Sequence, residues 1–114
     1  MVEIKAQPFA FPARLKEMAL IVIDMQRDFA EPGGFGASLG NDVNGIARII
    51  PDVKRLIEGF RTAGLPVIHT MECHRPDLSD LPAAKRNRGN PSLRIGDLGP
   101  LGRVLIAGEP GTAI

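Results

Sequence analysis

Two polar segments of the sequence carry residue types that can take part in catalysis. Asp24 directly follows the apolar run 19–23, and the segment 72–75, Glu-Cys-His-Arg, follows a second apolar run. A carboxylate that emerges from an apolar strand is partly removed from water, which suits a general base. The structural alternative is that Asp24 only caps the turn after the strand, and the spacing alone leaves both interpretations open.

The apolar runs predict the elements that position these residues. Residues 19–24 and 66–71 are short, mostly apolar stretches, and the first is typical of a strand buried on both faces of a parallel sheet. Between them, apolar residues recur every three or four positions from Val43 to Phe60, which predicts a helix. Pro51 interrupts this pattern, so we expect a short helix before the proline and a longer helix that starts near it.

Strand, helix and strand in this order form a βαβ unit, and such crossovers join parallel strands. The carboxyl ends of neighbouring parallel strands lie at one edge of the sheet, about 4.8 Å apart. We therefore expect Asp24 and the segment 72–75 to lie side by side. Ligands of open α/β sheets bind outside this edge, so the candidate chemistry is predicted to gather there.

A long connection follows the second predicted strand. Residues 72–102 are rich in proline and glycine, and a connection of that length is usually functional or disordered. The stretch 75–103 carries six basic and three acidic side chains. These bases indicate a site for an anionic substrate or, more commonly, a solvated face or a subunit contact. The apolar stretch 103–107 is the last strand candidate.

The cysteine and the two histidines have plainer explanations than catalysis. Cys73 lies at the predicted ligand edge, but a reactive cysteine usually gains from a helix N-terminus or close cations, so we do not expect it to be the nucleophile. His69 lies within an apolar strand and is interpreted as a core residue. His74 and Glu72 do not have a recognisable zinc spacing, and no metal site is predicted.

Composition restricts the class of protein. The 114 residues include 14 Lys plus Arg and 13 Asp plus Glu, a net charge of +1. This balance argues against a non-specific nucleic-acid binder and gives no reason to expect an anionic membrane as partner. The single cysteine excludes an internal disulfide and fits a reducing compartment. No apolar run approaches the ~20 residues of a membrane span, so we predict a cytoplasmic protein.

The motifs also resemble a known family. The segment 20–29, Leu-Ile-Val-Ile-Asp-Met-Gln-Arg-Asp-Phe, resembles the first-strand motif of the isochorismatase-like cysteine hydrolases. The segment 69–82, with 94–97 and 108–111, is similar to the biuret and triuret hydrolase branch of this superfamily. The resemblance covers nearly all of residues 19–114. It implies a three-layer α/β fold, a parallel β-sheet flanked by helices that is incomplete in this chain, and an Asp-Lys-Cys triad.

The resemblance assigns roles to individual residues. It makes Asp24 the triad aspartate, the base that takes the proton from the nucleophilic thiol. Phe29 matches the aromatic residue that lines the small substrate pocket. Glu72 and Arg75 match the motif after the second strand, which makes them candidates for substrate-binding or supporting residues. Gln26 belongs to the first motif and is assigned a structural role.

The triad lysine and cysteine are the main departure from the family pattern. In the family both come from later in the chain than residue 114. The lysines present here lie in no matching motif; they are Lys5, Lys16, Lys54 and Lys85. Residues 1–114 are therefore interpreted as the N-terminal part of a single cysteine-hydrolase domain, and the 114-residue chain alone is predicted to be inactive.

The function predicted from the sequence is a cysteine amidohydrolase that cleaves a C–N bond of a small ureide, with biuret or triuret as the first expected substrates. One alternative is a ureidoacrylate-type or other isochorismatase-like amidase. Another is a non-catalytic binding or assembly subunit on the same scaffold. The resemblance implies no cofactor and no metal, and it implies a homo-oligomer, expected to be a homotetramer.

Overall fold

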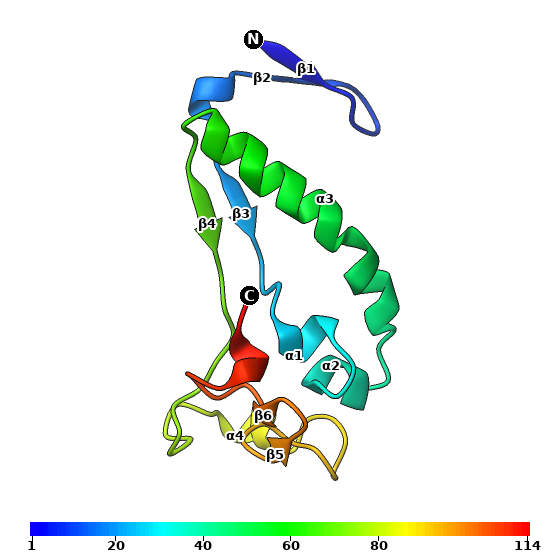
Figure 1. Ribbon diagram of the computed structural model, residues 1–114, viewed down its shortest axis with the longest axis vertical. Coiled ribbons are helices and arrows are strands. Elements are labelled where there is room, and N and C mark those ends of the chain that lie inside the picture. Colours follow the sequence, from blue (N-terminus) through cyan, green and yellow to red (C-terminus); the bar gives the residue numbers. More distant parts are fainter.

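Two short parallel strands stand at the centre of the computed structural model, which describes residues 1–114 (Figure 1). Strand β3 spans Leu20–Val22 and strand β4 spans Val67–His69, and they pair in parallel with Leu20 opposite Val67. The crossover between them is helical, as the βαβ pattern predicts. The α/β class and the parallel sheet are thus confirmed.

Helix α3 (Val43–Thr62) forms the crossover and runs without interruption through Pro51. The prediction of two helices divided at this proline is therefore wrong. Proline removes one backbone hydrogen bond, but the apolar side chains on both sides of it, Ile50 and Val53, lie on the same side of the helix as the strands. One continuous helix keeps both on that side. Neither α3 nor any shorter helix has the length and apolar character needed to cross a membrane.

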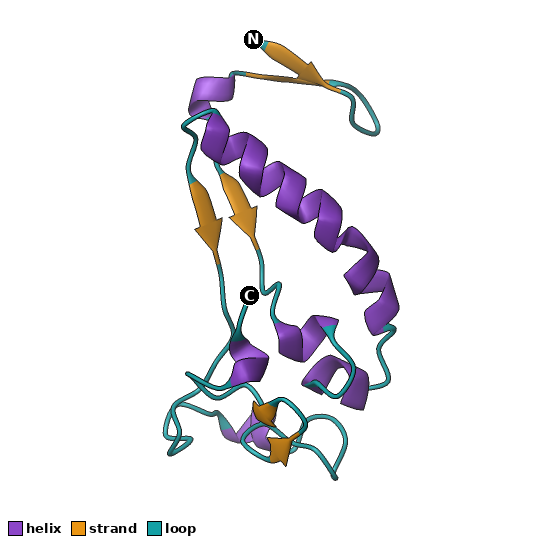
Figure 2. Cartoon of the chain, viewed as in Figure 1, coloured by secondary structure: helices purple, strands orange, loops and turns teal.

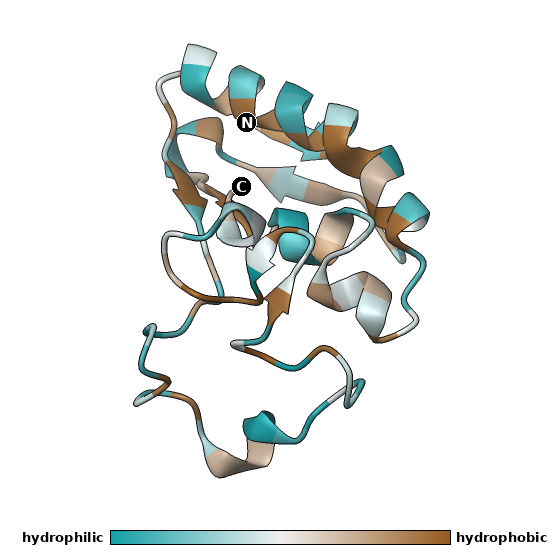
Figure 3. Cartoon of the chain, turned by 60° about the horizontal axis from the view of Figure 1, so that its bottom comes forward, coloured by the Kyte–Doolittle hydropathy of each residue, from teal (hydrophilic) through white to brown (hydrophobic).

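The two faces of the β3–β4 pair have different environments. Val22 and His69 point toward α3, since they line a cavity together with residues of that helix. Side chains alternate along a strand, so Ile21 and Ile68 point to the opposite face, where they are 54% and 49% exposed. Figure 3 shows the apolar parts of α3 turned toward the strands. The expectation of a strand buried on both faces is therefore wrong for residues 1–114, because a helix covers only one face.

The remaining elements are short (Figure 2). A hairpin of two antiparallel strands at the N-terminus is followed by a 3-10 turn, and both lie at the opposite end of the molecule from the long connection (Figure 1). These elements are β1 (Val2–Ile4), β2 (Phe11–Ala13) and η1 (Leu15–Glu17). The others are α1 (Arg27–Ala30), α2 (Phe35–Ser38), α4 (Ala83–Arg86), β5 (Leu98–Gly99), β6 (Gly102–Arg103) and η2 (Pro110–Thr112).

The stretch 103–107, predicted as a strand, is mostly irregular. Only Arg103 belongs to a strand, and Ile106 makes a single parallel bridge to His74. Leu105 breaks the extended conformation because its φ is +52°. Its N–H donates to Asp28 Oδ2 at 3.0 Å and its carbonyl accepts from His74 N at 2.7 Å. These two bonds, together with complete burial of the side chain, offset the cost of a left-handed leucine.

The most buried apolar side chains gather around this stretch and not under α3. They form one cluster, which consists of Phe35, Leu81, Ile95, Val104 and Leu105. Four of the five come from outside the βαβ unit: two from the long connection 72–102 and two from the stretch 103–107. The long connection is therefore an ordered part of the core in this structure.

The glycine-rich segment after α1 lets two short helices approach each other. A Cβ on Gly34 would lie 2.5 Å from the backbone oxygen of Asp28, and one on Gly36 would lie 2.9 Å from that of Phe29. Such separations leave no room for a side chain. The glycines are thus required for the packing of α2 against α1.

Candidate active site

Asp24 lies just beyond the end of β3 and is bound to Thr70, which lies just beyond the end of β4. The Thr70 hydroxyl donates to Asp24 Oδ1 at 2.7 Å and accepts from Asp24 N at 3.0 Å. Asp24 has a φ of +50°, a left-handed conformation in which aspartate is more common than most residues. The strand therefore ends sharply at Asp24, and its carboxylate is held at the carboxyl edge of the parallel sheet.

Gln26 continues the pairing of the two segments of the chain beyond the ends of β3 and β4. Its side-chain Oε1 accepts from Glu72 N at 2.8 Å and its Nε2 donates to Glu72 O at 2.8 Å. The amide thus takes the place of a backbone peptide in a sheet ladder. Gln26 is completely buried, and Nε2 also donates to Thr112 O at 3.3 Å. These contacts agree with the structural role predicted for Gln26.

The Glu72 carboxylate is engaged with two basic side chains. Oε1 pairs with Lys85 Nζ from α4 and lies 3.8 Å from His74 Nε2. Lys85 was not predicted to contribute to this region, because it follows Glu72 by 13 residues and no motif joins them. In this structure, Glu72 therefore holds part of the long connection against the end of β4.

Arg75 lies on the surface, and only its backbone makes a defined contact in this region. Arg75 N donates to Asp80 Oδ1 at 3.0 Å, and His74 Nδ1 lies 3.4 Å from the same oxygen. The hydrogen bond from the Arg75 backbone is the main cause that lowers the pKa of Asp80, and the nearby His74 makes a smaller contribution in the same direction. The Arg75 guanidinium itself is exposed, and its assignment as a substrate-binding residue remains a prediction.

Asp28 is a buried acid that the sequence analysis did not single out. Its side chain is almost fully inaccessible and accepts the backbone N–H of Leu105 at 3.0 Å. Burial raises the pKa of the Asp28 carboxyl, and backbone N–H groups of Leu105 and Phe35 partly oppose that rise. A Cβ on Gly111 would overlap the Asp28 carboxylate, so position 111 requires glycine. The sequence signal that could have identified Asp28 was its position as the second acid of the Asp-Met-Gln-Arg-Asp motif.

Phe29 packs against the apolar cluster around Leu105. It lies on α1, one residue after Asp28, and is only partly buried. The structure thus explains Phe29 as a packing residue on the side of the site that faces the connection. Its assignment to the substrate pocket remains a prediction.

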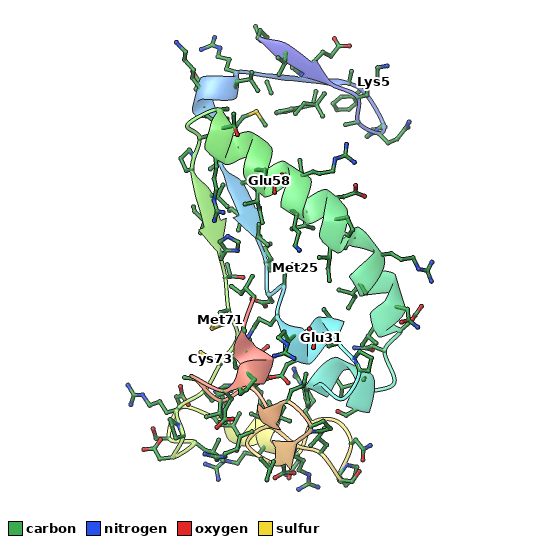
Figure 4. All side chains as sticks on the ribbon, viewed as in Figure 1. Lys5, Met25, Glu31, Glu58, Met71 and Cys73 are labelled. Atoms are coloured by element: carbon green, nitrogen blue, oxygen red, sulfur yellow. The ribbon has the colours of Figure 1, made fainter.

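Cys73 follows Glu72 on the segment that leaves β4, where Figure 4 labels it below Met71. It is free and partly buried. It does not begin a helix, and Lys85, the cation that reaches this segment, is paired with Glu72. These surroundings give no support for an activated thiolate.

A cavity of about 630 Å³ lies between α3 and the ends of the two strands. Its lining includes Val22, Gln26 and His69, and on the helix Ile50, Val53 and Ile57. Neither Asp24 nor Glu72 contributes to its lining. His69 Nδ1 is buried there without a hydrogen-bond partner. The interpretation of His69 as a core residue with satisfied hydrogen bonds is therefore wrong for this nitrogen.

The site as a whole offers one carboxylate suited to proton transfer. Asp24 is partly buried, fixed by Thr70 and located at the edge where α/β sheets bind ligands. No group of three or more His, Cys, Asp or Glu side chains is arranged to hold a metal ion. Asp24 and Glu72 lie at the same edge of the sheet, as predicted, whereas the contacts of Thr70 and Lys85 were not predicted.

Residues 18–114 match the isochorismatase domain family, and the chain belongs to that family. The parallel strands and the helical crossover agree with an α/β domain of this class.

Among curated relatives, the chain is similar to proteins named ureidoacrylate amidohydrolase RutB. It is 41% identical over 68 residues to the protein from Caulobacter segnis, a match that covers 60% of this chain and 28% of the relative. It is 44% identical over 64 residues to that of Yersinia enterocolitica, which covers 56% and 27%. The corresponding match in Serratia proteamaculans is 41% over 63 residues, covering 55% and 25%. The matched stretch thus spans less than a third of these relatives.

Proposed function

We propose that the protein containing this chain is an amidohydrolase of the isochorismatase family that cleaves a C–N bond of a small ureide. The observation that carries the proposal is the Asp24 carboxylate, held by Thr70 at the carboxyl edge of the parallel strands. Family membership and the names of the relatives support hydrolysis of a C–N bond.

In this proposal Asp24 acts as the general base for a cysteine thiol supplied from outside residues 1–114. The thiolate forms a bond to the ureide carbonyl carbon, and the C–N bond breaks as ammonia or an amine departs with the proton that Asp24 received. A water molecule then attacks the carbonyl carbon of the resulting thiocarbamate, the C–S bond breaks, and the product leaves as a carbamate while the sulfur regains its proton. A covalent route of this kind divides one difficult hydrolysis into two easier steps.

Ureidoacrylate-type compounds are the preferred substrates in this proposal, ahead of biuret and triuret. The relatives that match this chain are named for ureidoacrylate, and this favours the alternative raised from the sequence over its first expectation. The residues near Asp24 do not distinguish these compounds, so the preference rests on the names of the relatives.

The test is turnover by the longest form of the protein that contains residues 1–114. Initial rates of release of ammonia or carbamate from ureidoacrylate, biuret and triuret are measured over the same range of concentrations. We expect the highest kcat/KM with ureidoacrylate and none for residues 1–114 alone. Higher kcat/KM with biuret or triuret would restore the first expectation. Absence of turnover with all three would favour a binding or assembly subunit.

The assembly of the protein is part of the same proposal. The resemblance suggests a homotetramer, and the open face that carries Ile21 and Ile68 is apolar surface of the kind that is normally covered. Light scattering on the longest form gives the oligomeric state directly.

A further inference from the structure

The geometry points to Thr70 as a positioning residue for Asp24, an inference that rests on the proposed amidohydrolase function. Thr70 lies outside the motif segment that contains Asp24 and comes 46 residues later in the sequence. We infer that its hydroxyl determines which oxygen of the Asp24 carboxylate is free to receive a proton.

The hydroxyl makes two bonds to the same residue. It donates its proton to Asp24 Oδ1 at 2.7 Å and accepts the N–H of Asp24 at 3.0 Å. A single hydroxyl thus fixes both the backbone and the carboxylate of Asp24. Rotation of the carboxylate plane would break the bond between Oδ1 and the hydroxyl.

Thr70 is itself held firmly. Its backbone N–H donates to Val22 O at 2.9 Å, which extends the β3–β4 ladder by one bond. A β-branched side chain has restricted rotation about χ1, so the hydroxyl loses little freedom when it binds Asp24. The contact is therefore anchored in the sheet and not in a loop.

The two oxygens of Asp24 are consequently not equivalent. Oδ1 is occupied by the Thr70 hydroxyl, whereas none of the side-chain hydrogen bonds in the structure uses Oδ2. Oδ2 is thus the oxygen that can accept a proton from a thiol. A donor on Oδ1 stabilises the ionised carboxylate, the form that a general base requires.

Charged side chains on the neighbouring segments are engaged elsewhere. Arg27 on α1 pairs with Glu31, Asp28 accepts from Leu105, and Glu72 after β4 pairs with Lys85. Asp24 takes part in none of the ion pairs of the structure. Thr70 is therefore the side chain whose removal should alter the carboxylate most directly.

The test compares Thr70→Val, which keeps the shape and removes the hydroxyl, with Thr70→Ser, which keeps the hydroxyl. Thr112→Val is the matched control, because Thr112 also has a mostly buried hydroxyl, bound to Glu109 O at 2.8 Å and away from Asp24. Each variant is prepared in the longest form of the protein containing residues 1–114.

We expect Thr70→Val to lower kcat by about 10- to 100-fold, the rate equivalent of one hydrogen bond to a charged group. KM should change by less than about threefold, because Thr70 orients the base and does not hold the substrate. Thr70→Ser should restore most of kcat, and Thr112→Val should leave kcat and KM unchanged.

A second measurement separates this inference from the proposed function. The exchange rate of the Asp24 backbone N–H, which donates to the Thr70 hydroxyl, is measured by NMR in the wild type and in the Thr70 variants, which needs no turnover. Faster exchange in Thr70→Val that returns to the wild-type rate in Thr70→Ser supports the inference even if none of the three ureides is hydrolysed. Unchanged exchange in Thr70→Val, or a Thr70→Ser enzyme as slow as Thr70→Val, would overturn it.

Discussion

The helix–strand unit and the connection that follows it are held together in different ways. Helix α3 is the longest element, yet none of its 20 residues is buried. In the irregular stretch 104–106, by contrast, no side chain is more than 1% exposed. A helix satisfies its own backbone groups and can remain half-exposed, whereas irregular backbone requires specific partners. Leu105 obtains them from Asp28 and His74.

The candidate site lies where these two regions meet. Asp24 and Thr70 extend the strand pair, and Gln26 and Glu72 continue the pairing into the connection. The base is therefore supported by regular structure on one side and by buried polar contacts on the other. Substitutions in the strand pair and in the buried polar contacts should therefore have different effects on activity and on stability.

The largest effect is expected at Asp24. In the longest form of the protein, Asp24→Asn should reduce kcat by about 10²- to 10⁴-fold, because a positioned general base contributes that much and asparagine cannot accept the proton. The fold should be retained, since the amide has nearly the same shape. Ammonia release and circular dichroism measure the two effects, and a rate within tenfold of wild type would remove Asp24 from the mechanism.

Leu105→Ala should cause the largest loss of stability. The side chain is fully buried in the apolar cluster, and such truncations cost about 2–5 kcal/mol. Urea unfolding gives the difference directly. A loss of unfolding free energy below about 1 kcal/mol would mean that the irregular region is not the main core. The proposed difference between this region and the helix–strand unit would then be wrong.

The stability contributed by Asp28 should decrease as the pH rises, whereas the stability contributed by an ordinary ion-paired carboxylate increases. Burial raises its pKa in the folded state above the ordinary value of 3.8, so the folded protein binds the proton more tightly than the unfolded one. This contribution to stability is present at acid pH and decreases as the pH rises from 3.8 to the raised folded value.

Asp28→Asn should remove that dependence while keeping an acceptor for Leu105 N–H. Unfolding free energies of the wild type and the variant are compared across the acid range. The wild type should lose stability relative to Asp28→Asn as the pH rises. Parallel curves for the two proteins would show that the Asp28 carboxyl does not titrate differently on folding.

Ile68→Ala should have a small effect in the 114-residue chain. The side chain is 49% exposed on the face of the sheet that no helix covers, so its loss should cost less than about 1 kcal/mol. The same substitution in the longest form is the informative comparison. A cost there of more than about 2 kcal/mol would show that this face is covered in the complete protein.

The smallest effect is expected at Cys73. The thiol is partly buried and has no helix N-terminus beside it, so Cys73→Ser should change kcat by less than about threefold. Loss of nearly all activity with the fold retained would identify Cys73 as the nucleophile and contradict the proposed mechanism.

The sequence by itself determined the βαβ unit and the edge at which Asp24 and Glu72 meet. Both follow from local patterns: apolar runs at 19–24 and 66–71, helical periodicity between them, and the requirement that a crossover join parallel strands. The periodicity alone did not establish that α3 continues through Pro51. The packing of apolar residues on both sides of the proline against one sheet decided that point.

Only the tertiary structure decided how the site is supported. The contacts of Asp24 with Thr70, Glu72 with Lys85, and Asp28 with Leu105 join residues 46, 13 and 77 positions apart. No local propensity encodes such pairs, because each depends on which segments the fold brings together. Leu105 makes the reason plain. Its apolar neighbours favour a strand, but a buried carboxylate that needs its N–H holds it in a left-handed turn.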